Sequence, residues 1–322
     1  MKKHPKNHPV ADTQSPLFLV GAERSGTTLL RLMLDHHPRL AFHSEFEFAV
    51  DYFNDGRFPA IEEFIDAVQT DRIFHASGLL IDTRLSYPEL MNSFLEQYRR
   101  RQDKPLVGAT VHRHFDRLLK LWPNARFIHL VRDPRDVARS CVAMNWAGNP
   151  WAGVERWIEV EHLWDSIQPS ITPGNRIDIH YEELVAHPVE TSRRICEFIG
   201  VEFDQQMFSY TRHTRYGLPD ARMAGQWREK MSPRDVQRVE SRVGSLLQQR
   251  GYTSAGGSLN HPSHLHRKYL AIESALIVKT RRVGLYGLPL VTASWLANRL
   301  GIRHWQKQVQ RRRNEIDARL LK

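Results

Sequence analysis

The fold of this chain is decided by the stretch Leu17-Phe18-Leu19-Val20-Gly21-Ala22-Glu23-Arg24-Ser25-Gly26-Thr27-Thr28-Leu29-Leu30, which joins an apolar strand, a tight turn and a helix start. Four apolar residues at 17–20 predict a buried parallel strand, and the two glycines bracket a sharp turn. Apolar residues at 29, 30 and 32–34 predict a helix that ends before Pro38. The free N–H groups of its first turn, with the helix dipole, predict a site for a phosphate or sulfate oxygen.

The turn differs from a Walker loop in one respect. In the pattern Gly-x4-Gly-Lys-Ser/Thr the lysine reaches the terminal phosphates and the hydroxyl binds magnesium. Here Thr27 stands at the lysine's position, and the cation is Arg24 inside the turn. An arginine fork can hold several anionic oxygens without a metal, so the sequence disfavours a magnesium-nucleotide hydrolase. The short pattern also fits a plain strand, polar turn and helix.

A second apolar segment, 125–131, runs directly into Arg132 and Asp133. It predicts another buried strand and then a helix, with Asp133 as the N-cap and Pro134 at the first helical position. Arg132 would lie at the carboxyl end of a strand, where open α/β sheets bind ligands, and Ser140 on the following helix. Two anion-binding loops predict one ligand with two separated anionic groups.

Together these segments resemble the sulfotransferases that use 3′-phosphoadenosine 5′-phosphosulfate (PAPS). In that family a Lys/Arg-Ser-Gly-Thr-Thr loop holds the 5′-phosphosulfate, and an arginine followed eight residues later by a serine holds the 3′-phosphate. The matching residues here are Arg24-Ser25-Gly26-Thr27-Thr28 and the pair Arg132 and Ser140. The Arg-Ser-Gly-Thr-Thr form most resembles the bacterial and tyrosylprotein branch.

The resemblance continues to about residue 252. Segments 180–184 and 194–200 are similar to the strand, loop and helix that follow the family's core, and Tyr181 stands where relatives carry a tyrosine near the adenine. Trp227-Arg228 and Gly251-Tyr252 resemble the family's closing segment. The resemblance implies a P-loop-like three-layer α/β fold with a central parallel sheet, PAPS as donor without a required metal, and adenosine 3′,5′-bisphosphate as product.

The chemistry that the resemblance implies is in-line transfer of a sulfuryl group to an acceptor hydroxyl or amine. Such a transfer needs charge neutralisation at the leaving phosphate, which Arg24, Thr27, Thr28 and the loop amides would supply, and a base for the acceptor proton. We expect Glu45 to be this base, because tyrosylprotein-type relatives carry a glutamate at about this distance from the first helix. Neighbouring phenylalanines predict a partly desolvated carboxylate. A solvated strand residue or a salt-bridge partner is the alternative.

His112 is the competing base. Many relatives carry Lys-Thr-Pro or Lys-Ser-His in this region, and the lysine helps the leaving group or the histidine acts as base. This chain departs from the pattern, because Ala109 or Thr110 occupies the lysine's approximate place and Lys104 lies too early to be assigned. A lone histidine is more often a structural hydrogen-bonding group than a base.

Composition limits the other possibilities. The chain has 322 residues, 41% of them hydrophobic, which is enough for one sizeable core. No apolar run reaches the roughly 18 residues of a transmembrane helix, and the basic segment 1–9 lacks the apolar stretch of a signal peptide. The two cysteines, Cys141 and Cys196, lie on predicted helix faces, which favours buried thiols in a reducing, cytoplasmic compartment. Val137, Cys141 and Met144 form the predicted buried stripe of the second helix.

Apolar residues also recur at helical spacing in segments outside the two loops. Residues 49–105 predict helices in the region where the family resemblance is weakest and acceptor specificity is expected. Trp157 and Trp164, seven residues apart, are expected to pack a helix on the core rather than to contact substrate. The acceptor itself, whether a small molecule, glycan, lipid or peptide, cannot be inferred from these patterns.

The basic excess lies entirely in the C-terminal part. From Ala255 onward 13 Lys and Arg residues stand against 3 acidic ones, which accounts for the formal net charge of +10. The Gly- and Ser-rich segment 254–258 predicts a linker, so we expect a sulfotransferase domain at 1–254 and a basic helical extension at 255–322. The extension could contact an anionic membrane surface, pack on the body, or form an oligomer contact. Nucleic-acid binding is not expected, because no recognition fold accompanies the charge.

Two other functions stay open at this point. A small-molecule kinase with the same loop would turn over ATP with magnesium and should carry a lysine near position 27. A non-catalytic membrane-surface binding protein would be organised by the basic extension.

Overall fold

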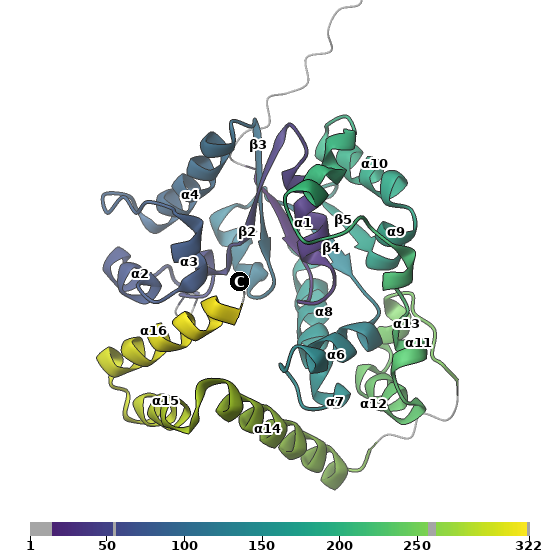
Figure 1. Ribbon diagram of the computed structural model, residues 1–322. Helices are drawn as coiled ribbons and strands as arrows, with labels where there is room; N and C mark the ends of the chain where they lie inside the picture. Colours follow the sequence, from purple (N-terminus) through teal and green to yellow (C-terminus); the bar gives the residue numbers. More distant parts are fainter. Residues whose placement is uncertain (1–14, 54–55, 257–261, 321–322) are drawn as a thin grey trace, which may run out of the picture.

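The computed structural model describes residues 15–53, 56–256 and 262–320. At its centre lies a parallel five-stranded sheet in the order β2-β3-β1-β4-β5 (Figure 1). The strands are β1 (Leu17–Val20), β2 (Leu40–Glu45), β3 (Leu106–Val111), β4 (Arg126–Val131) and β5 (Arg176–His180). The strand predicted at 17–20 is confirmed, and the one predicted at 125–131 begins one residue later.

Helices cover both faces of this sheet and continue beyond it. The α-helices of the first 256 residues are α1 (Thr27–Asp35), α2 (Ile61–Val68), α3 (Arg72–Ser77), α4 (Tyr87–Gln102), α5 (Leu118–Leu121), α6 (Pro134–Ala143), α7 (Pro150–Gly153), α8 (Glu155–Ile167), α9 (Tyr181–Ala186), α10 (Pro188–Ile199), α11 (Trp227–Lys230), α12 (Pro233–Val243) and α13 (Leu246–Gln249). Helices α2, α3 and α4 confirm the prediction for residues 49–105.

The side chains of β1 point alternately to the two faces of the sheet, and the core has one part on each face. Phe18 and Val20 pack on one face of the sheet with side chains of α4, α6 and α8. Leu17 and Leu19 pack on the other face with side chains of α1, α9 and α10. Because successive strand residues point to opposite faces, one apolar run of four residues anchors both layers of helices. The predicted three-layer α/β fold is confirmed.

Helix α6 begins where the sequence predicted. It ends at Ala143, one residue before Met144, the last residue of the predicted buried stripe. Asp133 is the N-cap and accepts a hydrogen bond from the backbone N–H of Arg135, with Pro134 in the first helical position. Val137 and Cys141 are buried as expected. The prediction for Met144 is wrong: it is 45% exposed, because the helix ends at Ala143 and Met144 is its C-cap.

Buried aromatic and sulfur side chains agree with the sequence predictions. Trp157 and Trp164 are almost fully buried on α8 and belong to the core rather than to a surface pocket. Cys141 and Cys196 are free, buried thiols, and burial raises the pKa of each to about 11. Neither thiol is therefore ionised at neutral pH.

Three helices make up the C-terminal extension: α14 (His264–Tyr286), α15 (Leu288–Leu300) and α16 (Arg303–Leu320). Helix α14 runs below α6 and α7, and α16 returns beneath α2 and α3 (Figure 1). Asn314 donates to the carbonyl of Thr70 at 3.1 Å, and Lys307 pairs with Asp66 on α2. The extension thus packs on the body at two separate places.

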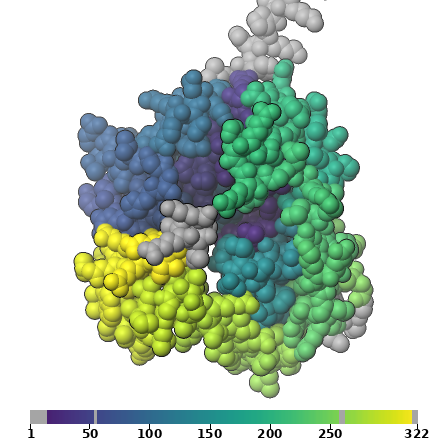
Figure 2. Space-filling model, viewed as in Figure 1, coloured from purple at the N-terminus to yellow at the C-terminus, as the bar shows by residue number. Residues whose placement is uncertain are grey.

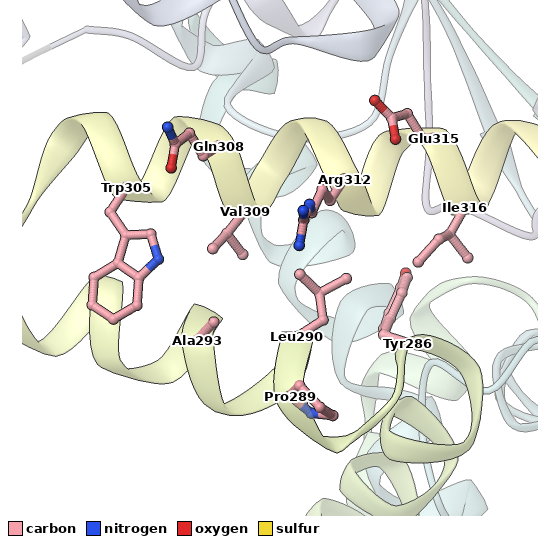
Figure 3. Close-up of a pocket in the computed structure, with 10 residues that line it drawn as sticks. All are labelled: Tyr286, Pro289, Leu290, Ala293, Trp305, Gln308, Val309, Arg312, Glu315 and Ile316. Atoms are coloured by element: carbon pink, nitrogen blue, oxygen red, sulfur yellow. The ribbon is translucent and has the colours of Figure 1, made fainter.

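A hollow of about 530 Å³ separates α15 from α16. Figure 3 shows Trp305, Val309 and Ile316 of α16 facing Leu290 and Ala293 of α15. All of its lining residues come from the extension, so this hollow lies apart from the strand ends.

Some predictions fall outside the described residues. The basic segment 1–9 and the last part of the expected linker, 257–258, are among them. Within the described residues, every helix is too short or too polar to cross a bilayer.

Candidate active site

The carboxyl ends of all five strands carry a residue or loop that the sequence singled out. The loop 21–26 follows β1, and Glu45 is the last residue of β2. His112 follows β3, Arg132 follows β4 and Tyr181 follows β5. Because the strands are parallel, these groups meet at one edge of the sheet. This edge is the candidate site.

The loop after β1 is shaped by two glycines and one strained residue. A Cβ on Gly21 would lie 2.3 Å from the carbonyl oxygen of Leu130, and a Cβ on Gly26 would lie 2.3 Å from the ring of Tyr181. Gly26, with φ +95°, is the N-cap of α1, and no side chain of the described residues caps this helix. Arg24 itself has φ +72°, an uncommon conformation for a residue with a side chain. The loop therefore presents backbone N–H groups at a helix N-terminus, as an anion site requires.

Direct contacts join the two predicted anion-binding motifs. Arg24 donates from Nε to Ser140 Oγ at 2.9 Å. Arg132 donates from Nη1 to the carbonyl oxygen of Arg24 at 3.2 Å, and from Nη2 to that of Met223 at 2.8 Å. The motifs were predicted to bind two separated anionic groups, yet in the structure their side chains adjoin one another. Met223 shows that the segment before α11 also reaches the site.

Tyr181 forms the floor between the two motifs. It is 4% exposed, its ring packs against Gly26, and the Arg132 guanidinium carbon lies 4.2 Å from the ring centre. Burial raises the pKa of Tyr181, so the phenol stays neutral and offers its face to the cation.

Several buried polar atoms at the site have no hydrogen-bond partner among the described residues. They include the acceptors Glu47 Oε2 and Asp136 Oδ2 and the two donors Ser25 Oγ and Arg132 Nε. An unsatisfied buried donor costs about 1–3 kcal/mol, so both donors would be stabilised by an anionic oxygen. Both belong to the residues that the resemblance assigns to PAPS, and the residues present therefore fit such a ligand.

The two candidate bases lie near one another, with Glu47 of η1 (Glu47–Ala49) beside both. Glu45 is exposed, so the expected desolvation by neighbouring phenylalanines is wrong: it stands at the strand end, while Phe42 and Phe46 point into the core. The buried carboxylate is Glu47, which is 2% exposed and whose pKa is raised by burial. Its Oε1 accepts from the backbone N–H of His112 at 3.0 Å.

His112 is held at both its backbone and its ring. Nδ1 lies 2.9 Å from the carbonyl oxygen of Gly21, and because a carbonyl only accepts, Nδ1 carries the proton. Nε2 is then the ring nitrogen that faces away from this hydrogen bond. His112 thus supports the turn after β1, and its second nitrogen stays available for proton transfer.

Lys104 lies away from this edge. It precedes β3 and donates to the carbonyl oxygens of Asp35 and Leu40, which belong to the end of α1 and the start of β2. Lys104 therefore lies at the amino ends of the strands and is not part of the candidate site. Among the described residues, no three His, Cys, Asp or Glu side chains are grouped as a metal site requires.

Polar contacts from distant segments support the loop after β4. Asp136 is buried, burial raises its pKa, and it accepts from the backbone N–H of Trp227 at 2.9 Å. Tyr252 donates to Glu182, which also accepts from the backbone N–H of Asp133. The segments predicted to close the domain therefore brace the second motif. Sequence patterns missed Glu47, Asp136 and Met223, since each acts through a tertiary contact.

Comparison with known proteins agrees with this geometry. The sequence profile of the sulfotransferase family matches residues 16–205. Protein-tyrosine sulfotransferase A of Caenorhabditis elegans is 24% identical over 205 residues, which are 60% of this chain and 52% of that protein. Protein-tyrosine sulfotransferase 2 of Gallus gallus is 24% identical over 209 residues, 60% of this chain and 53% of that protein. The chain spans about half the length of these two curated relatives.

A solved structure shares the fold. The sulfotransferase domain from the curacin biosynthetic pathway superimposes with a TM-score of 0.53 at 18% identity, covering 74% of this chain and 98% of that domain. The profile match includes all five strands, the loop after β1, and both Arg132 and Ser140. The chain belongs to the sulfotransferase family.

Proposed function

We propose that this chain transfers a sulfuryl group from PAPS to an acceptor hydroxyl or amine. The observation that carries the proposal is the contact between the two anion-binding motifs at the carboxyl edge of the sheet, Arg24 to Ser140 and Arg132 to the Arg24 carbonyl. The unsatisfied Ser25 Oγ and Arg132 Nε support it, as does membership of the family.

The residues divide into three tasks. Arg24, Ser25, Gly26, Thr27 and Thr28 bind the 5′-phosphosulfate and neutralise charge on the leaving phosphate, where fixed donors are most effective. Arg132 and Ser140 bind the 3′-phosphate, and Tyr181 lies near the adenine. PAPS, when bound, supplies an activated sulfuryl group in line with the acceptor.

Glu45 accepts the acceptor proton in this proposal. It stands exposed at the end of β2, where an entering hydroxyl can reach it. Glu47 and His112 position this edge, because Glu47 holds the His112 backbone and the His112 ring holds the Gly21 carbonyl. His112 is the alternative base through its free Nε2.

Radiolabelled PAPS tests the proposed reaction. The full chain is incubated with the donor and a panel of alcohols, phenols, amines, sugars and tyrosine peptides. Label should pass to an acceptor as adenosine 3′,5′-bisphosphate accumulates in equal amount. A chain that binds the bisphosphate but labels no acceptor would be a binding protein, and magnesium-dependent ATP turnover would favour a kinase.

We also propose a cytoplasmic location with contact to an anionic membrane surface. The exposed apolar side chains of α14 repeat at helical spacing at Leu265, Tyr269, Ile272 and Leu276. Lysines and arginines accompany them on the same extension, and each cation near an anionic surface contributes about 1 kcal/mol. The two free cysteines are consistent with a reducing compartment.

Vesicle sedimentation tests the membrane contact. The pair Ile272→Ser and Leu276→Ser should weaken binding to phosphatidylserine vesicles about tenfold or more, while Leu80→Ser, an equally exposed leucine of the body, should not. Unchanged binding of the double variant would remove the proposal. A mass that rises with concentration would assign the stripe to an oligomer contact instead.

A further inference from the structure

The C-terminal extension and the body border a large cavity that is open to solvent on one side. It has a volume of about 1040 Å³ and lies between residues 146–155, which follow α6, and the helices α14 and α15. Figure 2 shows the C-terminal helices, in yellow and yellow-green, along the lower edge of the molecule, below the teal segment that contains α6 and α7. Ligand pockets of small molecules span roughly 300–1,000 Å³, so the cavity is as large as a ligand site.

Close packing fixes one wall of this cavity. Helix α14 approaches the body so closely that a Cβ on Gly148 would lie 2.7 Å from the Cα of Ser274. The backbone N–H of Gly148 donates to Ser274 Oγ at 2.8 Å, and Asn149 donates to the carbonyl oxygen of Leu270 at 2.8 Å. The extension is therefore docked on the segment that follows α6, and the cavity results from that docking.

The cavity adjoins the loop after β1 through Trp146. This ring lines the cavity, and its centre lies 5.8 Å from the guanidinium of Arg24 and 5.2 Å from that of Arg156. Arg156 pairs in turn with Glu23 of the same loop at 2.5 Å. Arg24, which is proposed to grip the leaving phosphate, is not part of the cavity wall, and the Trp146 ring lies between it and the cavity.

The lining is long and mostly apolar, and it also includes the charged residues Glu155, Arg242, Lys279, Arg282 and Arg313. Along α14 it runs from Ala271 to Tyr286, about 22 Å at the helical rise of ~1.5 Å per residue. Aliphatic side chains such as Val278 and Val291 and the ring of Trp295 form much of the surface. An apolar chain in such a site gains about fourfold in affinity for each buried methylene, whereas a polar acceptor would lose its hydration there.

We infer that this cavity is the acceptor site and that its ligand is a long-chain alcohol, with the alkyl or isoprenoid chain between α14 and α15 and the hydroxyl beyond Trp146. The inference rests on the proposed function. The acceptor oxygen forms a new bond to sulfur as the bond between sulfur and the phosphate oxygen breaks. The hydroxyl proton passes to Glu45, and adenosine 3′,5′-bisphosphate leaves.

Binding of a brominated alcohol tests the inference without turnover. Bromine quenches tryptophan fluorescence at contact, and Trp146, Trp151 and Trp295 line the cavity. The full chain, without donor, should show saturable quenching by 12-bromododecan-1-ol. The variants Val278→Phe and Val291→Phe fill the cavity from opposite helices and should each weaken this binding tenfold or more. Leu300→Phe, at an exposed position of α15 that does not line the cavity, should not.

Adenosine 3′,5′-bisphosphate binding is measured on the same variants. It should be unchanged in all of them, and in the transfer assay kcat/KM of the wild type should rise with alkanol length by about fourfold per methylene. Absent quenching in the wild type, or quenching retained in both filled variants, overturns the acceptor site even if the bisphosphate binds. A tyrosine peptide sulfated equally by wild type and filled variants also overturns it. Loss of bisphosphate binding in the wild type contradicts the proposed function instead.

Discussion

At the scale of the residue, the site depends on groups whose roles are set by neighbours distant in sequence. Glu45 and Glu47 are two residues apart, yet one is exposed at a strand end and the other is buried beneath the His112 backbone. Motif spacing predicted Arg24, Arg132 and Ser140 as site residues, and the structure brings these three residues together. The sequence could not separate the two glutamates, since their burial depends on how η1 packs below β3.

The base assignment predicts a specific kinetic change. Glu45→Gln should lower kcat about 10²- to 10⁴-fold, because the acceptor proton loses its base, and leave bisphosphate affinity unchanged. Steady-state kinetics and calorimetry measure the two quantities. Glu63→Gln, an exposed glutamate of α2, serves as the control.

The variant His112→Gln tests whether His112, rather than Glu45, is the base. If Glu45 is the base, this variant should mainly weaken donor binding, because the ring no longer supports the Gly21 carbonyl. A Glu45→Gln variant with wild-type kcat, together with a His112→Gln variant that has lost turnover, would transfer the role to His112.

At the scale of the element, local patterns were sufficient for the strands and helices that carry the proposed donor site. The apolar run 17–20, the Asp133 cap and Pro134 predicted β1 and α6 from short-range chemistry. Met144 was assigned to the buried stripe because periodicity alone does not show where a helix ends. Local patterns do not predict which side chains of different elements pair with one another. His129 on β4, for example, pairs with Asp178 on β5 and with Glu161 on α8.

This buried cluster predicts a pH dependence of stability. Burial disfavours a charged His129, but the Glu161 charge and the hydrogen bond to Asp178 outweigh it and raise the His129 pKa from 6.5 to about 9. A raised pKa in the folded state stabilises the protein fully below pH 6.5, and this stabilisation is lost as the pH rises through about 9. The loss should be on the order of 3 kcal/mol.

Urea unfolding between pH 6 and 10 measures this effect. The free energy of unfolding of the wild type should fall across that range, and His129→Gln should flatten the fall. Arg250, which pairs with Glu161 at 2.5 Å, keeps that carboxylate compensated in the variant. A wild-type curve without a decline above pH 6.5 would show that His129 is not charged in the folded protein.

At the scale of the whole molecule, the candidate site lies at the five strand ends, and the C-terminal helices pack on the segment after α6 and on α2. Charge and composition predicted a basic helical extension at 255–322, but not which surfaces α14 and α16 contact, because docking depends on close approaches such as Gly148 to Ser274. We assign donor binding to the sheet edge and acceptor choice to the cavity that the extension borders.

The central claim is that Arg132 and Ser140 bind the 3′-phosphate of the donor. Titration calorimetry compares adenosine 3′,5′-bisphosphate with adenosine 5′-phosphate on the wild type, on Arg132→Ala and Ser140→Ala, and on the exposed control Arg176→Ala. The wild type and the control should bind the bisphosphate at least tenfold more tightly, a preference worth about 1.4 kcal/mol or more, as charge-assisted hydrogen bonds supply. The two site variants should lose that preference. Equal affinity of the wild type for both nucleotides, or a preference retained in both variants, would contradict this claim.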